Sequence, residues 1–278
     1  MTRGVAWVTL RVYLCMGTYL LSNIIKTDDS DKDFLTTFAK GLEVIKSFND
    51  ETPSLTVTEL AQKVDISRAS ARRFLLTLSK LGYLNQNNSQ FSLSAKILDL
   101  GYAYLASCNF MERVTPIIEQ VSRDLNESCS VTVLEGREVV YIARASRSKL
   151  VSMNLQIGTR LPAYVTSTGR VHLSVLSDKQ LEDFFRDEPC KKLTAHTKNA
   201  KQIIAEIKKV RDQGYCLVNQ ELELGMCSLA VPVYDRANQL RLALIVSCNA
   251  WSVSPEEMRQ SILPVLKNAA KEITLVLP

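Results

Sequence analysis

Apolar residues recur with a helical period at the start of the first predicted domain. Phe34, Phe38, Leu42, Ile45 and Phe48 follow one another at spacings of three or four, which predicts an amphipathic helix with these side chains inward. A polar stretch that contains a proline follows and ends this helix.

A second, shorter helix is predicted from a capping-box pattern. Thr56 stands three residues before Glu59, so each side chain can satisfy a backbone N–H at the helix start. A tight turn at 65–66 follows, and Ser67 is a natural N-cap for a third helix. The inward positions of the second helix are Leu60, Ala61 and Val64.

The third helix has an apolar face and a basic polar face. Its inward stripe consists of Ala71, Phe74, Leu75 and Leu78. The residues left largely outside that stripe are Arg68, Ser70, Arg72, Arg73 and Thr77. A helix fits the major groove of DNA, arginine pairs bidentately with guanine, and serine or threonine reaches base edges or phosphates. The pattern therefore predicts a helix-turn-helix whose recognition helix begins at Ser67, with its positive N-terminal end near a phosphate. The alternative is a helical domain that binds protein.

Beyond Gly82 the pattern predicts a β-hairpin. Short alternating stretches flank an Asn-rich turn at 85–90. Directly after a recognition helix, such a hairpin is typical of the wing of a winged helix-turn-helix domain, which we assign to residues 34–94. Asn87 and Asn88 would then touch the minor groove or phosphates, and a solvated loop without contacts is the alternative.

A further helical stripe predicts a linker helix over residues 95–109. Ile97, Leu100, Tyr104 and Leu105 share one face. We expect this face to be buried against a second copy, because a twofold homodimer matches a palindromic operator. Packing of the stripe on its own domain is the alternative. Beyond a break at 108–109 the stripe continues with Phe110, Val114, Ile117, Ile118, Val121 and Leu125.

Residues 110–278 mix strand and helix patterns. Alternation with a period of two predicts strands over 128–135, 138–143, 149–156, 215–219, 227–234 and 240–247. Helical patterns predict helices over 167–176, 178–185 and 199–213, and a last helix that opens at Ser254 and is kinked at Pro264. This mixture predicts an α+β domain, in which helices cover a central antiparallel sheet.

Length and charge agree with this division. The 278 residues favour two domains, and 46% hydrophobic with 23% charged residues excludes a disordered, collagen-like or multi-spanning membrane protein. Between Ile66 and Leu98 lie five basic residues and no acidic one, whereas the rest of the chain balances 29 basic against 29 acidic residues. The whole excess of +5 therefore falls on the predicted recognition helix, wing and linker start. That placement indicates contact with a polyanion, and a solvated charged face is the alternative.

Cysteines and histidines provide no catalytic or metal site. The seven cysteines are dispersed without a CxxC spacing and only two histidines accompany them, so we expect no metal and no cofactor. Dispersed thiols favour a reducing compartment, which places the protein in the cytoplasm. No GxGxxG, phosphate-loop, GxSxG or HExxH motif occurs, His172 fits a packing role, and His196 fits a surface loop. Glu221 and Glu223 have no companion nucleophile, and we expect no enzymatic activity.

Small polar residues among the apolar strands and turns of the second domain suggest a pocket for a small polar ligand. The candidates are Ser167, Thr168, Asn219, Ser228 and Ser247. For each of them, turn or capping chemistry is the alternative.

Residues 1–33 form an apolar segment followed by a polar run. Arg11 interrupts any signal-peptide core, and the 14 residues 12–25 are shorter than the roughly 20 that a membrane span needs. We interpret the segment as an extension outside the fold, for example from a start codon upstream of Met16. A membrane anchor is the alternative.

From Phe34 to Leu277 the chain resembles the IclR family of transcriptional regulators. The matching stretches include FAKGLEVIKSF, LTVTELAQKVDISRASARRFLLTL, ESCSVTVLEGREVVYIAR, GTRLPAYVTSTGR and GYCLVNQELELGMCSLAVPV. SRASARRFLLTL, LGYAYL, LPAY and QELELG are similar to the subgroup that controls aromatic-acid catabolism through the β-ketoadipate pathway, with protocatechuate or 4-hydroxybenzoate as inducer.

The resemblance implies a winged helix-turn-helix domain, a GAF-like effector domain, and dimers able to pair into tetramers. The implied partners are operator DNA and a small aromatic carboxylate that binds near TSTGR and ELELGMCSLAVPV. The competing hypothesis is an enzyme that metabolises a small acid, with the helical head as an interaction module.

Overall fold

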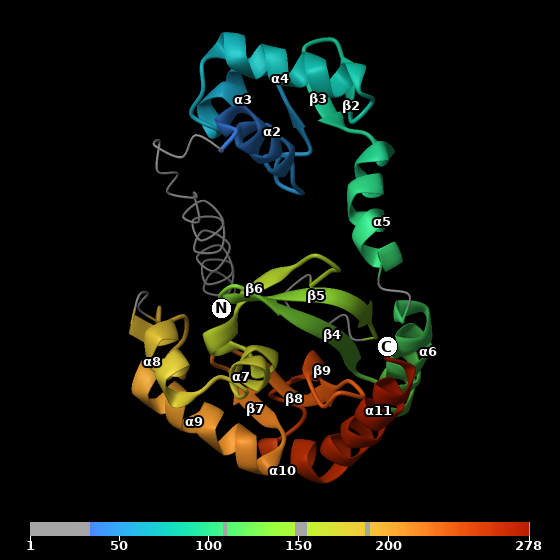
Figure 1. The fold of residues 1–278 in the computed structure, drawn as a ribbon, viewed down its shortest axis with the longest axis vertical. Coiled ribbons are helices and arrows are strands. Elements are labelled where there is room, and N and C mark those ends of the chain that lie inside the picture. The colour runs from blue at the N-terminus through green and yellow to red at the C-terminus, as the bar shows by residue number, and fades with distance from the viewer. Residues whose placement is uncertain (1–33, 108–109, 148–154, 187–189, 278) are drawn as a thin grey trace, which may run out of the picture. The chain divides into compact units, whose positions relative to one another are not determined.

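The computed structural model describes residues 34–107, 110–147, 155–186 and 190–277 and divides into two compact units, with the boundary between residues 108 and 109 (Figure 1). The first unit contains α2 (Thr36–Lys46), β1 (Ser54–Leu55), α3 (Val57–Lys63), α4 (Arg68–Lys80), β2 (Leu84–Asn87), β3 (Gln90–Leu93), the 3-10 turn η1 (Ala95–Ile97) and α5 (Leu98–Ser107).

The helix-turn-helix forms as its caps and turn predict. Thr56 and Glu59 make both hydrogen bonds of the capping box, which start α3. Asp65 adopts a left-handed conformation with φ 51°, and the half-buried Ile66 plugs the turn by packing on the core. The Oγ of Ser67 accepts the N–H of Ser70 and caps α4.

The face that α2 buries differs from the predicted one. Val44 and Phe48 are buried, whereas Phe38 and Leu42 remain 67% and 41% exposed. The predicted inward positions Phe38 and Leu42 were therefore wrong, and Val44 was missed. The core of this small unit extends only to the C-terminal half of α2, so periodicity alone could not identify the buried side.

The wing is a regular two-stranded hairpin with a third strand at its edge. Strands β2 and β3 pair from Leu84 opposite Leu93 to Asn87 opposite Gln90, and Asn88 in the turn has φ 54°. Most of the Asn-rich segment predicted as a turn is thus strand. The two-residue β1 pairs with β3 and was not predicted, because two residues carry no alternation.

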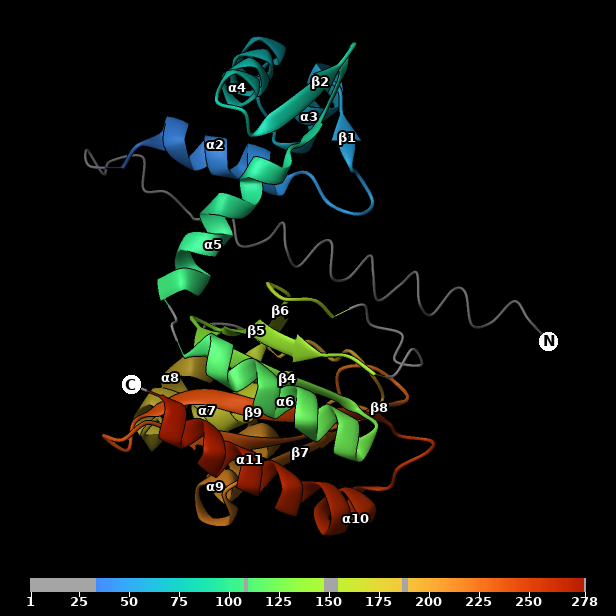
Figure 2. The same cartoon turned by 90° about the vertical axis from the view of Figure 1, so that its right-hand side faces the viewer.

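The second unit is an α+β domain around one antiparallel sheet in the order β6-β5-β4-β9-β8-β7. Its strands are β4 (Ser128–Glu135), β5 (Glu138–Ala145), β6 (Arg160–Pro162), β7 (Cys216–Asn219), β8 (Met226–Tyr234) and β9 (Leu240–Asn249). Its helices are α6 (Met111–Leu125), η2 (Ala163–Val165), α7 (Ser167–Leu173), α8 (Asp178–Arg186), α9 (Ala200–Gln213), α10 (Pro255–Glu257), the π-helical η3 (Met258–Ile262) and α11 (Leu263–Val276). Helices α6 and α11 lie together on one face, and α7 packs on the other with α9 beside it (Figure 2).

Most predicted elements of this domain are confirmed. Strand β4 has the predicted bounds, and β5, β7, β8 and β9 differ from theirs by at most two residues at either end. The strand predicted over 149–156 falls mainly on residues 148–154, outside the described residues, and residues 1–33 are also outside them. A kink was predicted at Pro264; in the structure Pro264 stands in the first turn of α11, directly after the five-residue π-helical segment η3.

The stripe predicted to continue the linker packs on its own domain. Val114, Ile118 and Val121 are buried against the sheet and α11, which is the alternative that the sequence left open. On α5, by contrast, Leu98, Leu100 and Tyr102 are exposed. The structure does not describe the side chains of Tyr104 and Leu105, so the predicted stripe is tested there only at Leu100. No helix in the described part of the chain is both long and apolar enough to cross a bilayer.

Candidate nucleic-acid interface and effector site

The outward face of α4 presents three exposed arginines. Arg68, Arg72 and Arg73 are all exposed, and none forms an ion pair with a described residue. The buried residues of the helix are Ala71 and Leu75, which hold the opposite side on the core. The guanidinium groups are therefore available to bases or phosphates.

The hydroxyl groups of α4 are less available. Besides capping the helix, Ser67 Oγ donates to Ser70 Oγ at 3.0 Å. Thr77 Oγ1 donates to the carbonyl of Arg73 at 2.7 Å, so its proton is used within the helix. Thr77 was predicted to contact DNA, and this geometry leaves it only as an acceptor, which a phosphate does not need.

The wing presents polar side chains without a negative charge. Asn87 and Asn88 are exposed at the tip of the hairpin, and Gln86 Nε2 donates to the carbonyl of Asn88 at 3.1 Å. The hairpin belongs to the same acid-free window as α4. Both elements can therefore approach a phosphate backbone without repulsion.

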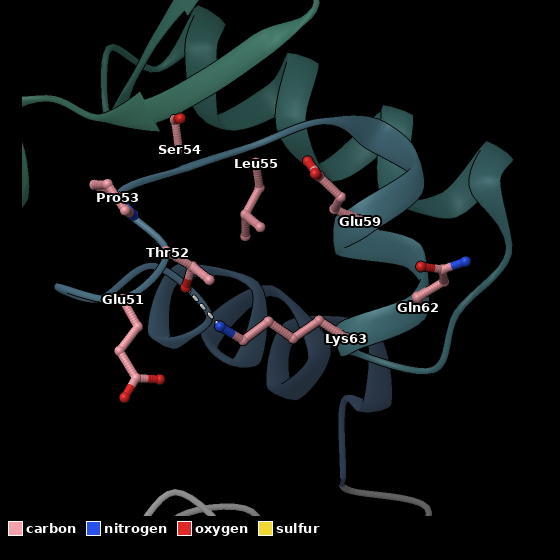
Figure 3. A pocket seen from close by; sticks show the side chains of 8 residues that line it. All are labelled: Glu51, Thr52, Pro53, Ser54, Leu55, Glu59, Gln62 and Lys63. Carbon is pink, nitrogen blue, oxygen red and sulfur yellow. Dashed lines mark hydrogen bonds between the residues drawn. The ribbon is translucent and has the colours of Figure 1, made fainter. Parts of the chain in front are cut away.

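A shallow hollow lies elsewhere on the same unit (Figure 3). Its lining residues are Glu51, Thr52, Pro53, Ser54, Leu55, Glu59, Gln62 and Lys63. The Lys63 ammonium donates to Thr52 Oγ1 at 2.6 Å. With two carboxylates and one engaged cation, this hollow repels a phosphate backbone, and it contains none of the predicted site residues.

In the second unit, a row of serines crosses the face of the sheet that α7 covers. Ser128 on β4 pairs with Ser247 on β9, which pairs with Ser228 on β8, so the three side chains share one face. Ser167 on α7 contacts this row, with its Oγ 3.0 Å from that of Ser228. All four residues are buried. Three of the five predicted effector residues are thus brought together, and Ser128 joins them.

The other two predicted effector residues, Thr168 and Asn219, do not belong to the serine row. Thr168 is fully buried on α7, and its hydroxyl has no hydrogen-bond partner in the structure. Asn219 pairs with Cys227, one residue before Ser228, so strand alternation directs it to the opposite face of the sheet. Val218 occupies the position beside Ser228, and assigning Asn219 to this set was an error of one residue in register.

Sequence reasoning missed Arg144 on β5. Its guanidinium donates to Ser130 Oγ at 3.3 Å and Ser128 Oγ at 3.5 Å, which places it beside the serine row. Burial lowers the pKa of Arg144, and no described carboxylate forms an ion pair with it. A half-buried cation among hydroxyl groups can donate charge-assisted hydrogen bonds to a carboxylate. The sequence carried no local signal for this site, because Arg144 lies opposite Ser130 only once β4 and β5 are paired in register.

A buried ion pair joins α7 to the loop after β7. Arg170 donates to both carboxylate oxygens of Glu221 at 2.9 and 2.6 Å, and its Nε donates to the carbonyl of Tyr164 at 2.9 Å. Burial opposes the charge of Arg170, but the hydrogen bonds that it donates to Glu221 raise its pKa above the usual value. Glu221 is thus engaged structurally, and this pairing could not be foreseen from two positions 51 residues apart.

Burial keeps one histidine and three cysteines of the domain neutral. Burial lowers the pKa of His172 to about 4, and its Nε2 lies 3.1 Å from the carbonyl of Thr132, in agreement with the predicted packing role. Burial raises the pKa of Cys129 to about 12 and those of Cys216 and Cys227 to about 11. Within the described ranges, no three metal-ligating His, Cys, Asp or Glu side chains come together.

A winged helix-turn-helix unit and a sensor-like α+β unit define a class of DNA-binding regulators with a small-molecule domain. Comparison with known proteins identifies the family. The model of the IclR helix-turn-helix domain matches residues 37–88, and that of the bacterial transcriptional regulator IclR C-terminal domain matches residues 102–275. The chain belongs to the IclR family of transcriptional regulators.

Among its relatives are regulators of aromatic catabolism. The chain is 39% identical to the Pca regulon regulatory protein of Pseudomonas putida, over 90% of this chain and 86% of the relative. It is 32% identical to the p-hydroxybenzoate hydroxylase transcriptional activator of Acinetobacter baylyi, over 87% of this chain and 92% of the relative.

Solved structures share the fold. A putative transcriptional regulator from Rhodococcus sp. RHA1 has a TM-score of 0.80 and 37% identity, covering 88% of this chain and 98% of that chain. The PobR inducer-binding domain from Acinetobacter, a double mutant in complex with 3-hydroxybenzoic acid, has a TM-score of 0.56 and 30% identity. It covers 59% of this chain and 96% of that chain.

Proposed function

We propose that this IclR-family regulator binds operator DNA through α4 and the wing and responds to a small aromatic carboxylate. The genes that it controls would serve aromatic-acid catabolism. The observation that carries the ligand class is Arg144, a half-buried cation without a carboxylate partner among the described residues, set beside a row of buried serines.

The DNA-binding half rests on charge and exposure. Arg68, Arg72 and Arg73 are exposed on a helix whose other side is held by the core, in a window without acidic residues. We assign base contacts to these arginines, and phosphate or groove contacts to Ser67, Ser70, Asn87 and Asn88.

The effector half rests on the spacing of the polar groups. Ser128 on β4 and Ser228 on β8 are separated by one strand, so they lie about 10 Å apart. A hydroxybenzoate is long enough to reach from one end of this row to the other. Its carboxylate would bind Arg144 beside Ser128, and its own hydroxyl group would lie near Ser228, Ser167 or Thr168. The relatives named for the Pca regulon and p-hydroxybenzoate hydroxylase, and the 3-hydroxybenzoic acid complex, support an aromatic acid.

A change in DNA binding on addition of the ligand requires that the ligand bind one conformation of the protein more tightly than another. A ligand with equal affinity for both conformations would not shift their equilibrium. We assign the mechanical coupling to the linker that includes α5. The exposed Leu98, Leu100 and Tyr102 support its burial in a homodimer, which could pair further into a tetramer. Because a regulator of genes must reach the chromosome, this function supports a cytoplasmic location for the protein.

The competing function, an enzyme that metabolises a small acid, has less support. Family membership favours a regulator, and burial holds His172 and the Cys227 thiol neutral. Glu221, the best candidate for an acid or base, is paired to Arg170.

DNA binding with and without ligand tests the proposal. Fluorescence anisotropy would follow binding of the full chain to DNA from upstream of neighbouring catabolic genes, at two salt concentrations, with 4-hydroxybenzoate, protocatechuate, benzoate or succinate added. We expect specific binding that weakens steeply with salt and changes at least threefold with an aromatic acid but not with succinate. Specific binding indifferent to every acid would refute the sensor role, and turnover of an acid would favour the enzyme.

A further inference from the structure

We propose that Ala69 reads the 5-methyl group of a thymine in the operator, and so sets part of the sequence specificity. This inference rests on the proposed DNA binding through α4. The arginines of a recognition helix account for recognition of guanine in the major groove. Ala69 is an apolar residue in the first turn of α4 that would face the same groove.

The position of Ala69 follows from the helical period. It precedes Leu78 by nine residues, which is two and a half turns, so the two side chains lie on opposite sides of α4. Leu78 packs on the core of the first unit, whereas Ala69 is exposed. Ala69 therefore lies at the centre of the outward face, on the same row as Arg73 one turn later. Arg72, about 100° from the buried Ala71, lies at the side of that face.

A methyl side chain at this place suits one base. In the major groove only thymine presents a methyl group, and alanine is among the side chains that contact it. A small residue in the first turn also lets the helix backbone approach the groove floor, which a larger side chain there would prevent. Ala69 and Arg73 are about 6 Å apart along the helix axis, and the DNA rise is about 3.4 Å per base pair. The thymine should thus lie within two base pairs of the guanine that Arg73 contacts.

Replacing thymine by deoxyuridine removes that methyl group and nothing else. An operator would be selected from a random DNA library with the full chain, and each of its thymines would then be replaced in turn by deoxyuridine. Burial of one methylene-sized group is worth about 0.8 kcal/mol, so we expect one thymine in each half-site to cost about fourfold in affinity. The same replacement in the Ala69→Gly variant should cost less than 1.5-fold, because the contacting methyl group is already gone.

Two controls keep the result interpretable. Ala95→Gly, at an exposed alanine outside α4, should keep the fourfold loss. Should glycine unfold α4, Ala69→Ser keeps the helix and should reduce the loss to below twofold. The proposal is overturned if every thymine tolerates deoxyuridine while specific binding persists, or if the loss is undiminished in both Ala69 variants. A chain that selects no sequence at all refutes the proposed DNA binding, and the role of Ala69 with it.

Discussion

Arg170 and Glu221 form a bidentate ion pair that is closed off from solvent, although 51 positions separate them in the chain. The pair joins α7, which carries Ser167 and Thr168, to the loop that follows β7. Glu221 Oε2 also accepts the backbone N–H of Lys198 at 3.2 Å. The elements beside the serine row are therefore held together by charge as well as by packing.

Breaking this pair should strongly destabilise the second unit. Removing one partner of a buried ion pair leaves an uncompensated charge and costs about 3–5 kcal/mol. We expect Glu221→Ala to lower the free energy of unfolding by that amount in urea titrations followed by circular dichroism. Lys198→Ala, which removes only the half-exposed ammonium 3.5 Å from Glu221, should cost less than about 1 kcal/mol. A small loss in Glu221→Ala would mean that water enters the site.

Arg144 should be needed for the effector but not for DNA binding. In Arg144→Gln the carboxylate of the ligand loses a charge-assisted hydrogen bond, worth about 1.5–3 kcal/mol, so its affinity should fall about 10- to 100-fold. Stabilisation by 4-hydroxybenzoate in thermal unfolding measures this loss. Arg147→Gln, which changes an exposed arginine three residues away, is the matched control and should keep the stabilisation. Equal behaviour of both variants would show that the carboxylate binds elsewhere.

The arginines of α4 should carry operator recognition. A bidentate contact to guanine is worth about 1–3 kcal/mol, so Arg72→Ala combined with Arg73→Ala should weaken specific binding at least about 30-fold. The dependence of affinity on salt should become shallower, because fewer counterions are released. Both quantities come from anisotropy titrations at several salt concentrations. Arg123→Ala, on α6, should leave them unchanged. Unaltered operator affinity in the double variant would exclude α4 as the recognition helix.

Thr77 should be dispensable for DNA binding. Its hydroxyl donates to the carbonyl of Arg73, and it therefore has no proton to offer a phosphate. We expect Thr77→Val to change operator affinity by less than twofold, whereas loss of a phosphate contact at Ser70→Ala should be larger. A loss in Thr77→Val beyond that of Ser70→Ala would show that the hydroxyl turns toward DNA in the complex.

His172 should make stability depend on pH between about 6.5 and 4. Burial lowers its pKa to about 4 in the folded state, below the usual 6.5, so the unfolded chain takes up a proton first as pH falls. The stabilisation is complete above pH 6.5 and is lost progressively toward pH 4, by up to about 3 kcal/mol. Urea unfolding at pH 7.5, 6.5 and 5.5 measures this slope.

A variant separates His172 from the carboxylates. His172→Gln should flatten the stability between pH 7.5 and 5.5. Asp235 affects the free energy of unfolding only at lower pH, because the backbone N–H of Gln239 and the Arg241 guanidinium lower its pKa below the usual value. An identical slope in His172→Gln would assign the pH dependence to another group.

Local patterns predicted the elements that depend on neighbouring residues. The capping box of Thr56 and Glu59, the cap at Ser67 and the alternation along β4 all involve groups a few positions apart, so the chain specifies them before it folds. The basic outward face of α4 was predictable for the same reason. The inward stripe of α2 was not, because only the extent of the core decides which side a helix buries.

What the sequence determined by itself is therefore the succession of most helices and strands, the basic outward face of α4 and the family. The tertiary structure alone decided which polar residues meet: Arg144 beside Ser128 and Ser130, Arg170 on Glu221, and Val218 rather than Asn219 next to Ser228. The physical reason is that these contacts depend on strand register and on pairing across distant segments. A shift of one residue in register turns a side chain to the other face of a sheet, and no local period in the sequence records that shift.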